Sequence, residues 1–271
     1  MGDDVTARTV RQVRALFISD VHLGTKGAKA ERLLDFLRHH QAGTIFIVGD
    51  LVDGWRLRKT WYWPPSHMDV LQTLLRAGSQ GARVVYIPGN HDEFARDYVG
   101  HQFGVVEVKR DAVHVTADGR RFLVMHGDEF DVVVGNARWL ALLGDWAYVA
   151  AMQVNWPINF VRRRLGFSPW SLSAWAKSKV KGAVNAIGSY RDTLSNAARK
   201  RGVDGIICGH IHTAAIEEGP QFSYVNTGDW VESCTAVLEN VDGRLELVHW
   251  PEQAAAETST ADESGKARPA A

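Results

Sequence analysis

Cysteine is scarce in this chain, and long apolar runs are absent from it. Cys208 and Cys234 are the only two cysteines among 271 residues, too few for a disulfide framework, so we expect a reducing compartment. No apolar run approaches the roughly 20 residues that a membrane-spanning helix needs. The polar N-terminus also lacks the apolar core of a secretion signal. These absences predict a cytoplasmic protein and leave contact with a membrane surface open.

The chain as a whole has no excess of positive or negative charge, but one stretch of it does. Lys plus Arg number 31 and Asp plus Glu number 31, so the net charge gives no argument for a nucleic-acid partner. Between Asp145 and Asp192, however, there is no acidic residue, while seven Lys and Arg residues lie in the same stretch. The remainder of the chain is therefore acidic, and this one stretch is strongly basic.

Short apolar runs recur along the chain, and a polar cluster follows each of them. They are rich in β-branched and aromatic residues and are closed by Gly or Pro, which is typical of buried strands. Five such runs cover residues 15–19, 44–48, 83–87, 122–125 and 205–208. Helix-like spacing of apolar residues separates the first three. This alternation predicts an α/β fold with polar residues at the carboxyl ends of its strands, where such sheets build their sites.

Two Asp-Gly pairs, at 118–119 and 242–243, lie between strand-like runs and predict β-hairpins. A second, partly antiparallel sheet that faces the first would give a four-layer α/β/β/α sandwich, and this is the fold class we expect. We assign residues 12–250 to this domain. Residues 252–271 are rich in Ala, Ser and Glu without periodicity, and they predict a disordered tail.

The polar clusters after the strands form five blocks of metal-binding residue types. They are D-x-H at Asp20 and His22, G-D at Asp50, G-N-H-D at Asn90, His91 and Asp92, H-G-D at His126, and G-H-x-H at His210 and His212. Oxygen and imidazole ligands bind divalent first-row metals, and two ions about 3.5 to 4 Å apart can clamp a phosphoryl group and activate water. Each block alone could be an ordinary turn or cap. Five of them in this order, each after a predicted strand, predict a two-metal phosphoesterase.

The ordered blocks resemble those of the calcineurin-like metallophosphoesterases over roughly residues 14 to 250. The resemblance implies two divalent metal ions, which we expect to be Mn²⁺, with one carboxylate shared between them. The first ion would take Asp20, His22, Asp50 and His212. The second ion would take Asp50, Asn90, His126 and His210. No ligand of the family pattern is missing from this sequence.

The same resemblance places His91 beside the phosphate, as a catalytic residue. There it could stabilise developing charge or protonate the leaving oxygen. Asp92 could orient His91 through a hydrogen bond, or it could be a plain turn or helix-cap residue. For Asp53 and Asp128, a supporting role around the site and a helix cap both stay open.

Within the superfamily, the chain looks most like the UDP-2,3-diacylglucosamine hydrolases of lipid A synthesis. Residues 17–22 match their opening F-I-x-D-x-H, and Trp55 stands five residues after the Asp of G-D-L, as theirs does. Those enzymes insert a helical lid between H-G-D and G-H-x-H, and residues 131–201 occupy that place here. The substrate contacts that we expect are Trp55, Arg162, Arg163, Lys177 and Lys181.

The predicted lid at 131–201 contains five of the ten tryptophans together with the basic stretch. Trp with Lys and Arg on helices suits a membrane interface, where the rings sit at the headgroup level. Alternatively, the segment is a helical hairpin that packs its aromatic residues on the core. The charge asymmetry favours an anionic lipid or a lipid-linked nucleotide and peripheral contact with the inner membrane surface. So many large apolar residues disfavour a nucleic-acid groove.

One residue departs from the pattern of the resembled hydrolases, because His91 stands where they typically have Arg. The sequence therefore leaves two alternatives to a UDP-2,3-diacylglucosamine hydrolase. The first is a phospholipase C-type hydrolase that acts on membrane glycerophospholipids. The second is a non-catalytic metal-site scaffold that binds protein partners, although such scaffolds usually lose metal ligands.

Overall fold

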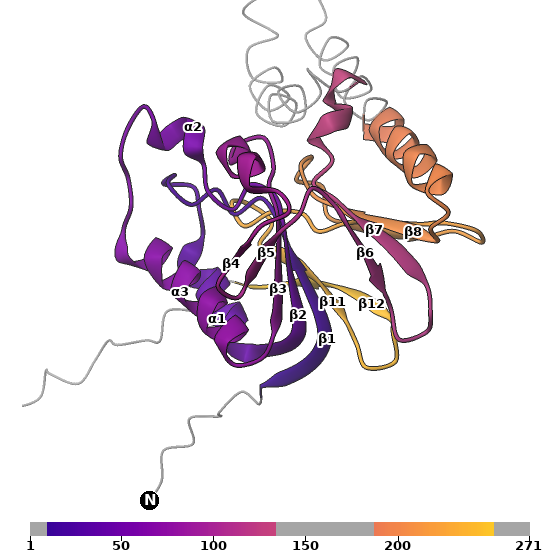
Figure 1. The fold of residues 1–271 in the computed structure, drawn as a ribbon, viewed down its shortest axis with the longest axis horizontal. Coiled ribbons are helices and arrows are strands. Elements are labelled where there is room, and N and C mark those ends of the chain that lie inside the picture. Colours follow the sequence, from indigo (N-terminus) through magenta and orange to yellow (C-terminus); the bar gives the residue numbers. More distant parts are fainter. Residues whose placement is uncertain (1–9, 134–186, 252–271) are drawn as a thin grey trace, which may run out of the picture.

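A computed structural model of the chain describes residues 10–133 and 187–251, and two β-sheets dominate it (Figure 1). The strands of the first sheet are β1 (Arg11–Ile18), β2 (His40–Val48), β3 (Arg83–Ile87), β4 (Gln102–Phe103), β5 (Val106–Val108), β11 (Thr235–Glu239) and β12 (Leu245–His249). Their spatial order is β12-β11-β1-β2-β3-β5-β4. The four central strands β1, β2, β3 and β5 run parallel, so their carboxyl ends lie at one edge.

The second sheet consists of β6 (Ala112–Val115), β7 (Arg121–Val124), β8 (Gly205–Cys208), β9 (Ala215–Glu218) and β10 (Ser223–Asn226). Their order is β6-β7-β8-β10-β9, with β7, β8 and β10 parallel and with an antiparallel strand at each edge. The predicted hairpins at 118–119 and 242–243 are both confirmed, since they join β6 to β7 and β11 to β12.

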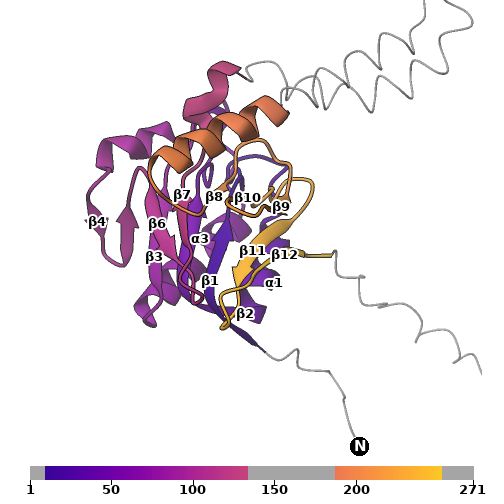
Figure 2. The same ribbon diagram turned by 90° about the vertical axis from the view of Figure 1, so that its right-hand side faces the viewer.

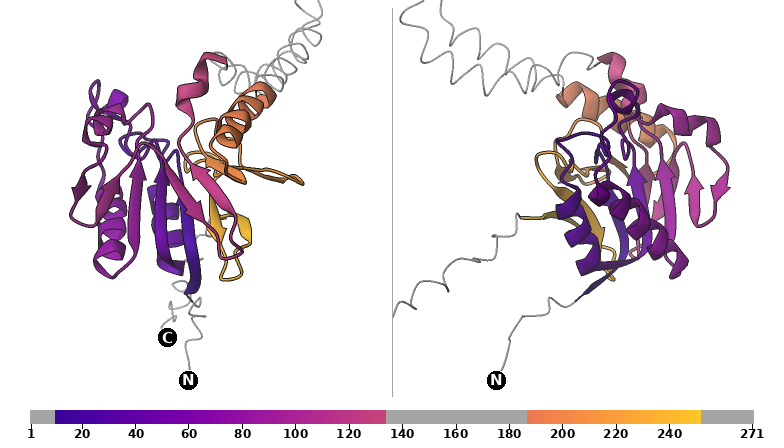
Figure 3. Two further views of the ribbon diagram at one scale, coloured as in Figure 1. Left: turned by 45° about the vertical axis from the view of Figure 1, so that its right-hand side comes forward. Right: turned by 90° about the vertical axis from the view of Figure 1, so that its left-hand side faces the viewer.

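Helices cover the outer faces of both sheets. The longer ones are α1 (Ala30–His39) and α3 (Pro65–Ser79) on the first sheet, and residues 187–200 form a helix on the second. Shorter elements are α2 (Gly54–Leu57) and the 3₁₀ helices η1 (Glu93–Tyr98) and η2 (Asp128–Val133). Figures 2 and 3 show helix 187–200 on the side opposite to α1 and α3. α1 forms because its apolar residues recur at helical spacing, and this buries Leu33, Leu34 and Leu37 on one face.

Apolar side chains fill the space between the two sheets. Phe17 and Phe46 stack there with ring centroids 4.9 Å apart, and they belong to one buried cluster with Phe122 and Ile207 of the facing sheet. Burial of such rings contributes on the order of 2 kcal/mol each to the fold. Helix, sheet, sheet and helix thus follow one another, and the predicted α/β/β/α fold class is confirmed.

Part of the predicted lid at 131–201 belongs to the sandwich itself. In helix 187–200, Tyr190, Leu194 and Ala198 are fully buried against the second sheet. A lid that ran to residue 201 would take this layer away, so the predicted boundary is wrong at that end. Residues 134–186, with the five tryptophans and the predicted contacts Arg162, Arg163, Lys177 and Lys181, lie outside the described residues. The predicted tail at 252–271 lies outside them as well.

Among the helices of residues 10–133 and 187–251, none is long and apolar enough to cross a membrane.

Candidate metal centre

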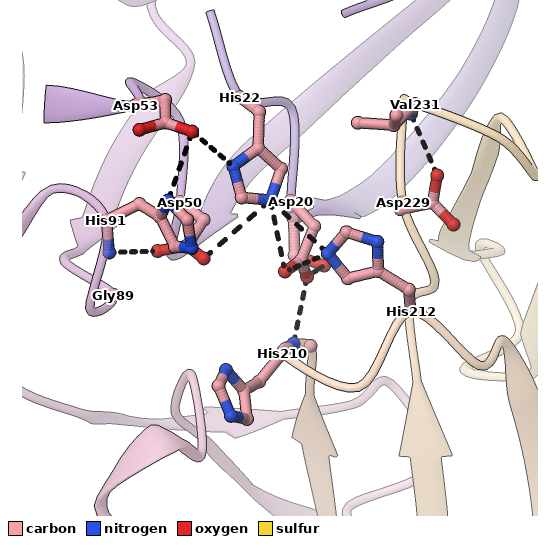
Figure 4. Close-up of polar contacts among 12 residues, drawn as sticks. Asp20, His22, Asp50, Asp53, Gly89, His91, His210, His212, Asp229 and Val231 are labelled. Atoms are coloured by element: carbon pink, nitrogen blue, oxygen red, sulfur yellow. Dashed lines mark hydrogen bonds and ion pairs between the residues drawn. The ribbon is translucent and has the colours of Figure 1, made fainter. Parts of the chain in front are cut away.

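All five polar blocks meet at the edge where the parallel strands end. β1, β2, β3, β7 and β8 each run directly into one block. Figure 4 shows residues of the loops after β1, β2, β3 and β8 together, and His126 after β7 joins them through Asp50. Asp20 and Asp50 are completely buried there. Burying two carboxylates so close together is unfavourable unless positive charge lies between them.

The backbone at this edge adopts an unusual conformation. Six residues other than glycine have a positive φ among those the structure describes, and five of the six belong to the blocks. They are Asp20, His22, Asp50, His210 and His212, with φ between 52° and 70°. Such residues cost on the order of 1 kcal/mol or more each and cluster at functional sites, where the surroundings hold them in place. Here the amide of Asp20 donates to the Gly49 carbonyl at 3.0 Å, so that neighbouring loops fix one another.

A first group of possible metal ligands consists of Asp20, His22 and His212. Nε2 of His212 lies 2.9 Å from Oδ1 of Asp20, and the Nε2 atoms of His22 and His212 are 3.3 Å apart. Asp50 adjoins this group, because its Oδ2 lies 3.8 Å from Nε2 of His22. The second oxygen of Asp20 accepts hydrogen bonds from the Ser19 hydroxyl at 2.6 Å and from the His210 amide at 2.9 Å. The carboxylate is thereby fixed with Oδ1 facing the imidazoles.

A second group consists of Asp50, His126 and His210. Nδ1 of His126 donates to the Val48 carbonyl at 2.8 Å, because a carbonyl can only accept, and Nε2 is therefore left for a cation. That Nε2 lies 3.5 Å from Oδ2 of Asp50. The glycine of the G-N-H-D block is needed for this packing, since a Cβ on Gly89 would come within 2.6 Å of Nε2 of His126.

The electrostatics of the second group also indicate a cation site. Within the described part of the chain, Oδ2 of Asp50, Oδ1 of Asn90 and Nε2 of His126 are buried and have no hydrogen-bond partner. Burial favours a raised pKa for Asp50, but the charge of His126 outweighs it and lowers that pKa to about 2. Burial likewise disfavours the charged form of His126, yet the Asp50 carboxylate raises the pKa of His126 to about 10. The buried carboxylates thus call for positive charge, which divalent ions can supply.

His91 lies beside the first group, and Asp53 is the carboxylate that meets it (Figure 4). Oδ2 of Asp53 is 3.1 Å from Nδ1 of His91 and 3.6 Å from Nδ1 of His22, so one oxygen faces both rings. Oδ1 of Asp53 accepts from the Arg56 amide at 2.8 Å and caps α2. Burial raises the pKa of Asp53, but hydrogen bonds from the two imidazoles and from Arg56 outweigh this and keep it low. Both roles left open for Asp53 from the sequence therefore occur.

Asp92 lies in the turn before η1, and its carboxylate bonds within this turn and to the loop after β2. Its carboxylate accepts from the amides of Gly89 at 2.6 Å and Leu51 at 2.8 Å, and from the Tyr86 hydroxyl at 2.5 Å. It makes no side-chain hydrogen bond to the N-terminus of η1, which begins at the next residue. Burial, followed by the charge of Asp50, raises the pKa of Asp92. Asp92 therefore ties the loops after β2 and β3 together. The carboxylate that lies against Nδ1 of His91 is that of Asp53.

Trp55, the predicted substrate contact on α2, lies against His91. The centroids of the two rings are 4.3 Å apart, and the Trp55 indole N–H donates to Glu93 at 3.2 Å. On the other side of the site, a cavity of about 250 Å³ opens beside His126 and is lined in part by Arg96 and Arg110. Both cations are paired with carboxylates, Arg96 with Asp128 at 2.6 Å. The centre thus has an aromatic side chain beside His91 and, beside His126, a recess in which two arginines are paired with Asp128 and Glu129.

Known proteins similar to this chain include a family whose profile covers the five blocks. The family profile of the calcineurin-like phosphoesterases matches residues 13–214, a range that includes all five blocks. A UDP-2,3-diacylglucosamine hydrolase of Xanthomonas campestris is 28% identical over 254 residues, which cover 84% of this chain and 96% of the relative. One from Escherichia coli is 26% identical over 245 residues, with 87% and 98% covered. Among solved structures, Yfce, a phosphoesterase from E. coli, has 14% identity and a TM-score of 0.42, with 88% and 99% covered.

Proposed function

The chain belongs to the calcineurin-like phosphoesterases and is a metal-dependent hydrolase, and we propose that it cleaves a pyrophosphate or phosphodiester bond in a lipid-linked substrate such as UDP-2,3-diacylglucosamine. The buried cluster of carboxylates and imidazoles at the strand ends carries the hydrolytic part of this proposal. The relatives named for that substrate, which align over most of the chain, support the lipid-linked part.

We assign two divalent ions to the cluster, with Asp50 shared between them. The first is held by Asp20, His22, Asp50 and His212, and the second by Asp50, Asn90, His126 and His210. Two of the three groups of convergent ligand atoms in the described residues, and the buried atoms without hydrogen-bond partners there, support this assignment. The third group, His22, Asp50 and His91, puts the His91 ring within reach of the shared carboxylate. The mixed oxygen and imidazole donors suit Mn²⁺. When bound, the ions supply Lewis-acid charge and an activated water for attack on phosphorus.

His91 is the group that we assign to the leaving oxygen. Its Nδ1 faces Asp53, so Nε2 is the nitrogen left to meet the substrate. The Asp53 carboxylate fixes the ring and stabilises its protonated form, which can donate a proton as the product departs. Trp55 covers one face of the same ring and limits the access of water. Asp53 is therefore a positioning residue, and His91 is the catalytic one.

We further propose that the protein works in the cytoplasm, at the inner membrane surface. Both cysteines are free and buried, which suits a reducing compartment. A substrate with two acyl chains resides in a bilayer, so the enzyme has to meet it there. The basic, tryptophan-rich composition of residues 134–186 supports such contact and supplies the proposed substrate residues Arg162, Arg163, Lys177 and Lys181.

A phospholipase C-type reaction on glycerophospholipids is the second candidate, and His91 is the observation that favours it. An imidazole can protonate a poor alcohol leaving group, whereas a guanidinium can offer only charge and hydrogen bonds. The complete donor set weighs against a scaffold without catalysis, because a binding surface has no need for so many buried ligands.

The two reactions give different phosphorus products. We would offer the Mn²⁺-loaded protein UDP-2,3-diacylglucosamine and phosphatidylcholine side by side and follow ³¹P NMR, with Asp50→Ala as the control. Pyrophosphate cleavage should yield UMP and a sugar 1-phosphate. Phosphocholine as the product would instead support the phospholipase. Hydrolysis of bis-p-nitrophenyl phosphate alone would reject a lipid substrate, and no hydrolysis at all would reject the enzymatic proposal.

A further inference from the structure

Residues 54–68 form a short segment of unusual composition beside the metal centre. It contains four of the chain's large aromatic residues, three cations and no acidic residue. The aromatic residues are Trp55, Trp61, Tyr62 and Trp63, and the cations are Arg56, Arg58 and Lys59. The catalytic proposal uses only Trp55 of this set, so the others call for a separate explanation.

The buried side chain of His67 anchors the C-terminal part of the segment. Nδ1 of His67 accepts the amide of Gly24 at 3.0 Å, which ties α3 to the loop that carries His22. The rings of Tyr62 and Trp63 meet His67 edge to face, with centroids 5.7 Å and 5.4 Å away. Trp63 also packs against the core under the first sheet. The backbone around residue 61 is therefore anchored on its C-terminal side.

Trp61 points away from this anchor and into solvent. It is 75% exposed, although the ring is close to that of Trp63, with centroids 6.2 Å apart. Arg58 and Lys59, three and two positions earlier, are exposed as well, and neither forms an ion pair with another residue of the described ranges. An exposed tryptophan beside two unpaired cations does not stabilise the folded state. The arrangement indicates that something else covers it.

Two more exposed aromatic side chains lie beside the active centre, close to this segment in the chain or in space. Trp55, 41% exposed, packs on His91. Phe94, 44% exposed, lies beside Gly54 at the start of α2. Figure 1 shows α2 and η1 at the end of the molecule where the strands run out. Glu93 of η1 is an acidic neighbour, and one of its carboxylate oxygens accepts a hydrogen bond from the Trp55 indole. We call Trp55, Arg58, Lys59, Trp61 and Phe94 the aromatic rim.

We propose that the aromatic rim docks on a bilayer surface that contains anionic phospholipids. The indole rings would sit at the headgroup level, where Trp is enriched, and the cations would meet lipid phosphates. The inference deepens the proposed function, because it rests on a substrate carried in a membrane. It turns the side of the centre that carries Trp55 and His91 toward the lipid, so that a headgroup could reach the ligand cluster without leaving the surface.

Vesicle binding of the full-length protein tests the rim without any turnover. Protein would be sedimented with phosphatidylcholine vesicles, with and without phosphatidylglycerol. We expect binding only when the anionic lipid is present, and weaker binding at high salt. Trp61→Ala should weaken binding about tenfold. The double variant Arg58→Gln/Lys59→Gln should weaken it roughly 25-fold, since each cation near such a surface contributes about 1 kcal/mol.

Matched controls come from exposed residues elsewhere on the protein. Val241, on the turn between β11 and β12, is also 75% exposed, and Lys200 is an exposed cation at the end of helix 187–200. Val241→Ala and Lys200→Gln should bind vesicles like the unaltered chain. All of these variants should hydrolyse bis-p-nitrophenyl phosphate at the unaltered rate.

Several results would overturn the docking proposal. Equal vesicle binding by Trp61→Ala and the unaltered chain would do so, as would equal binding to neutral and anionic vesicles. Light scattering that showed a dimer lost on Trp61→Ala, with vesicle binding unchanged, would assign the rim to a second copy of the chain. Failure of the unaltered protein to hydrolyse the soluble phosphodiester would instead count against the proposed function and leave the vesicle result standing.

Discussion

The buried cluster at the strand ends and the aromatic rim beside it differ in how their side chains meet solvent. In the cluster, Asp20 and Asp50 are fully buried, and several fixed groups constrain each carboxylate. In the rim, Trp61 and its cations are held only from below and face water. The cluster determines which bond the protein can break, whereas the rim bears on where it meets the molecule that contains this bond. Substitutions in one region should therefore leave the other's function intact.

The largest effect should come from the centre of the cluster. Asp50→Ala removes the carboxylate that both proposed ions share, so metal content and turnover should fall together. The loss should be well beyond the 10- to 100-fold that a supporting residue costs. Metal analysis beside an assay on bis-p-nitrophenyl phosphate measures it, and vesicle binding should be unaffected. A variant that kept two ions and full turnover would exclude the bridging role.

His91→Ala should have the next largest effect and should separate chemistry from metal binding. Removing a general acid typically lowers kcat by about 10² to 10⁴. Metal content should stay close to that of the unaltered chain, because His91 is not among the ligands that we assign to the ions. His249→Ala, at an exposed position in β12, is the control. Loss of both metals from the His91 variant would move this residue into the metal centre.

Asp53→Asn should have a smaller effect, since the residue acts through His91 and His22. We expect kcat to fall about 10- to 100-fold, with the acidic limb of its pH profile displaced. The substitution should also change the stability of the metal-free protein. The pKa of Asp53 lies below its ordinary 3.8, because its hydrogen bonds outweigh burial. Its ionised form therefore stabilises the fold above pH 3.8, and this contribution disappears as the pH falls through the lowered pKa.

Denaturant titrations of the metal-free pair across acid pH would show that change. The free energies of unfolding of Asp53→Asn and the unaltered chain should differ at neutral pH and converge in acid. A constant difference at every pH would mean that the carboxylate's charge does not contribute, and that the variant acts through packing alone.

The smallest effect should appear at the rim, and only with lipid. Trp61→Ala should lower kcat/KM about tenfold for a substrate embedded in anionic vesicles, because less enzyme is at the surface. With a soluble phosphodiester the rate should be unchanged. An equal drop in kcat/KM on both substrates would show that Trp61 supports the metal centre itself. The rim and the cluster would then not have separate functions.

The two regions also differ in how far the sequence could predict them. The ligand types and the strands before them could be predicted, because each block follows a short apolar run that is closed by glycine or proline. The order of the blocks then indicated a shared edge of two sheets. β4, β5, β9 and β10 were not predicted, since they are only two to four residues long. β4 pairs with β5 and β9 pairs with β10 across short turns, while β5 and β10 join their sheets through β3 and β8.

Contacts that depend on three-dimensional placement could not be predicted in the same way. Asp92 follows His91 in the chain, yet the carboxylate on the His91 ring is Asp53, because the cap of α2 turns it toward the site. The positive φ of Asp20 and Asp50 is likewise a property of the assembled loops. Exposure of Trp61 depends on Trp63 and His67 packing beneath it. A sequence pattern gives residue types, whereas these features depend on which way side chains and backbone point in the folded chain.

The most direct test of the two-ion centre is anomalous diffraction from crystals soaked in Mn²⁺. We expect two peaks about 3.5 to 4 Å apart, one within reach of Asp20, His22 and His212 and one within reach of His126 and His210, with the Asp50 carboxylate between them. A single peak, or peaks away from these residues, would contradict the shared role of Asp50 and with it the proposed two-metal hydrolysis.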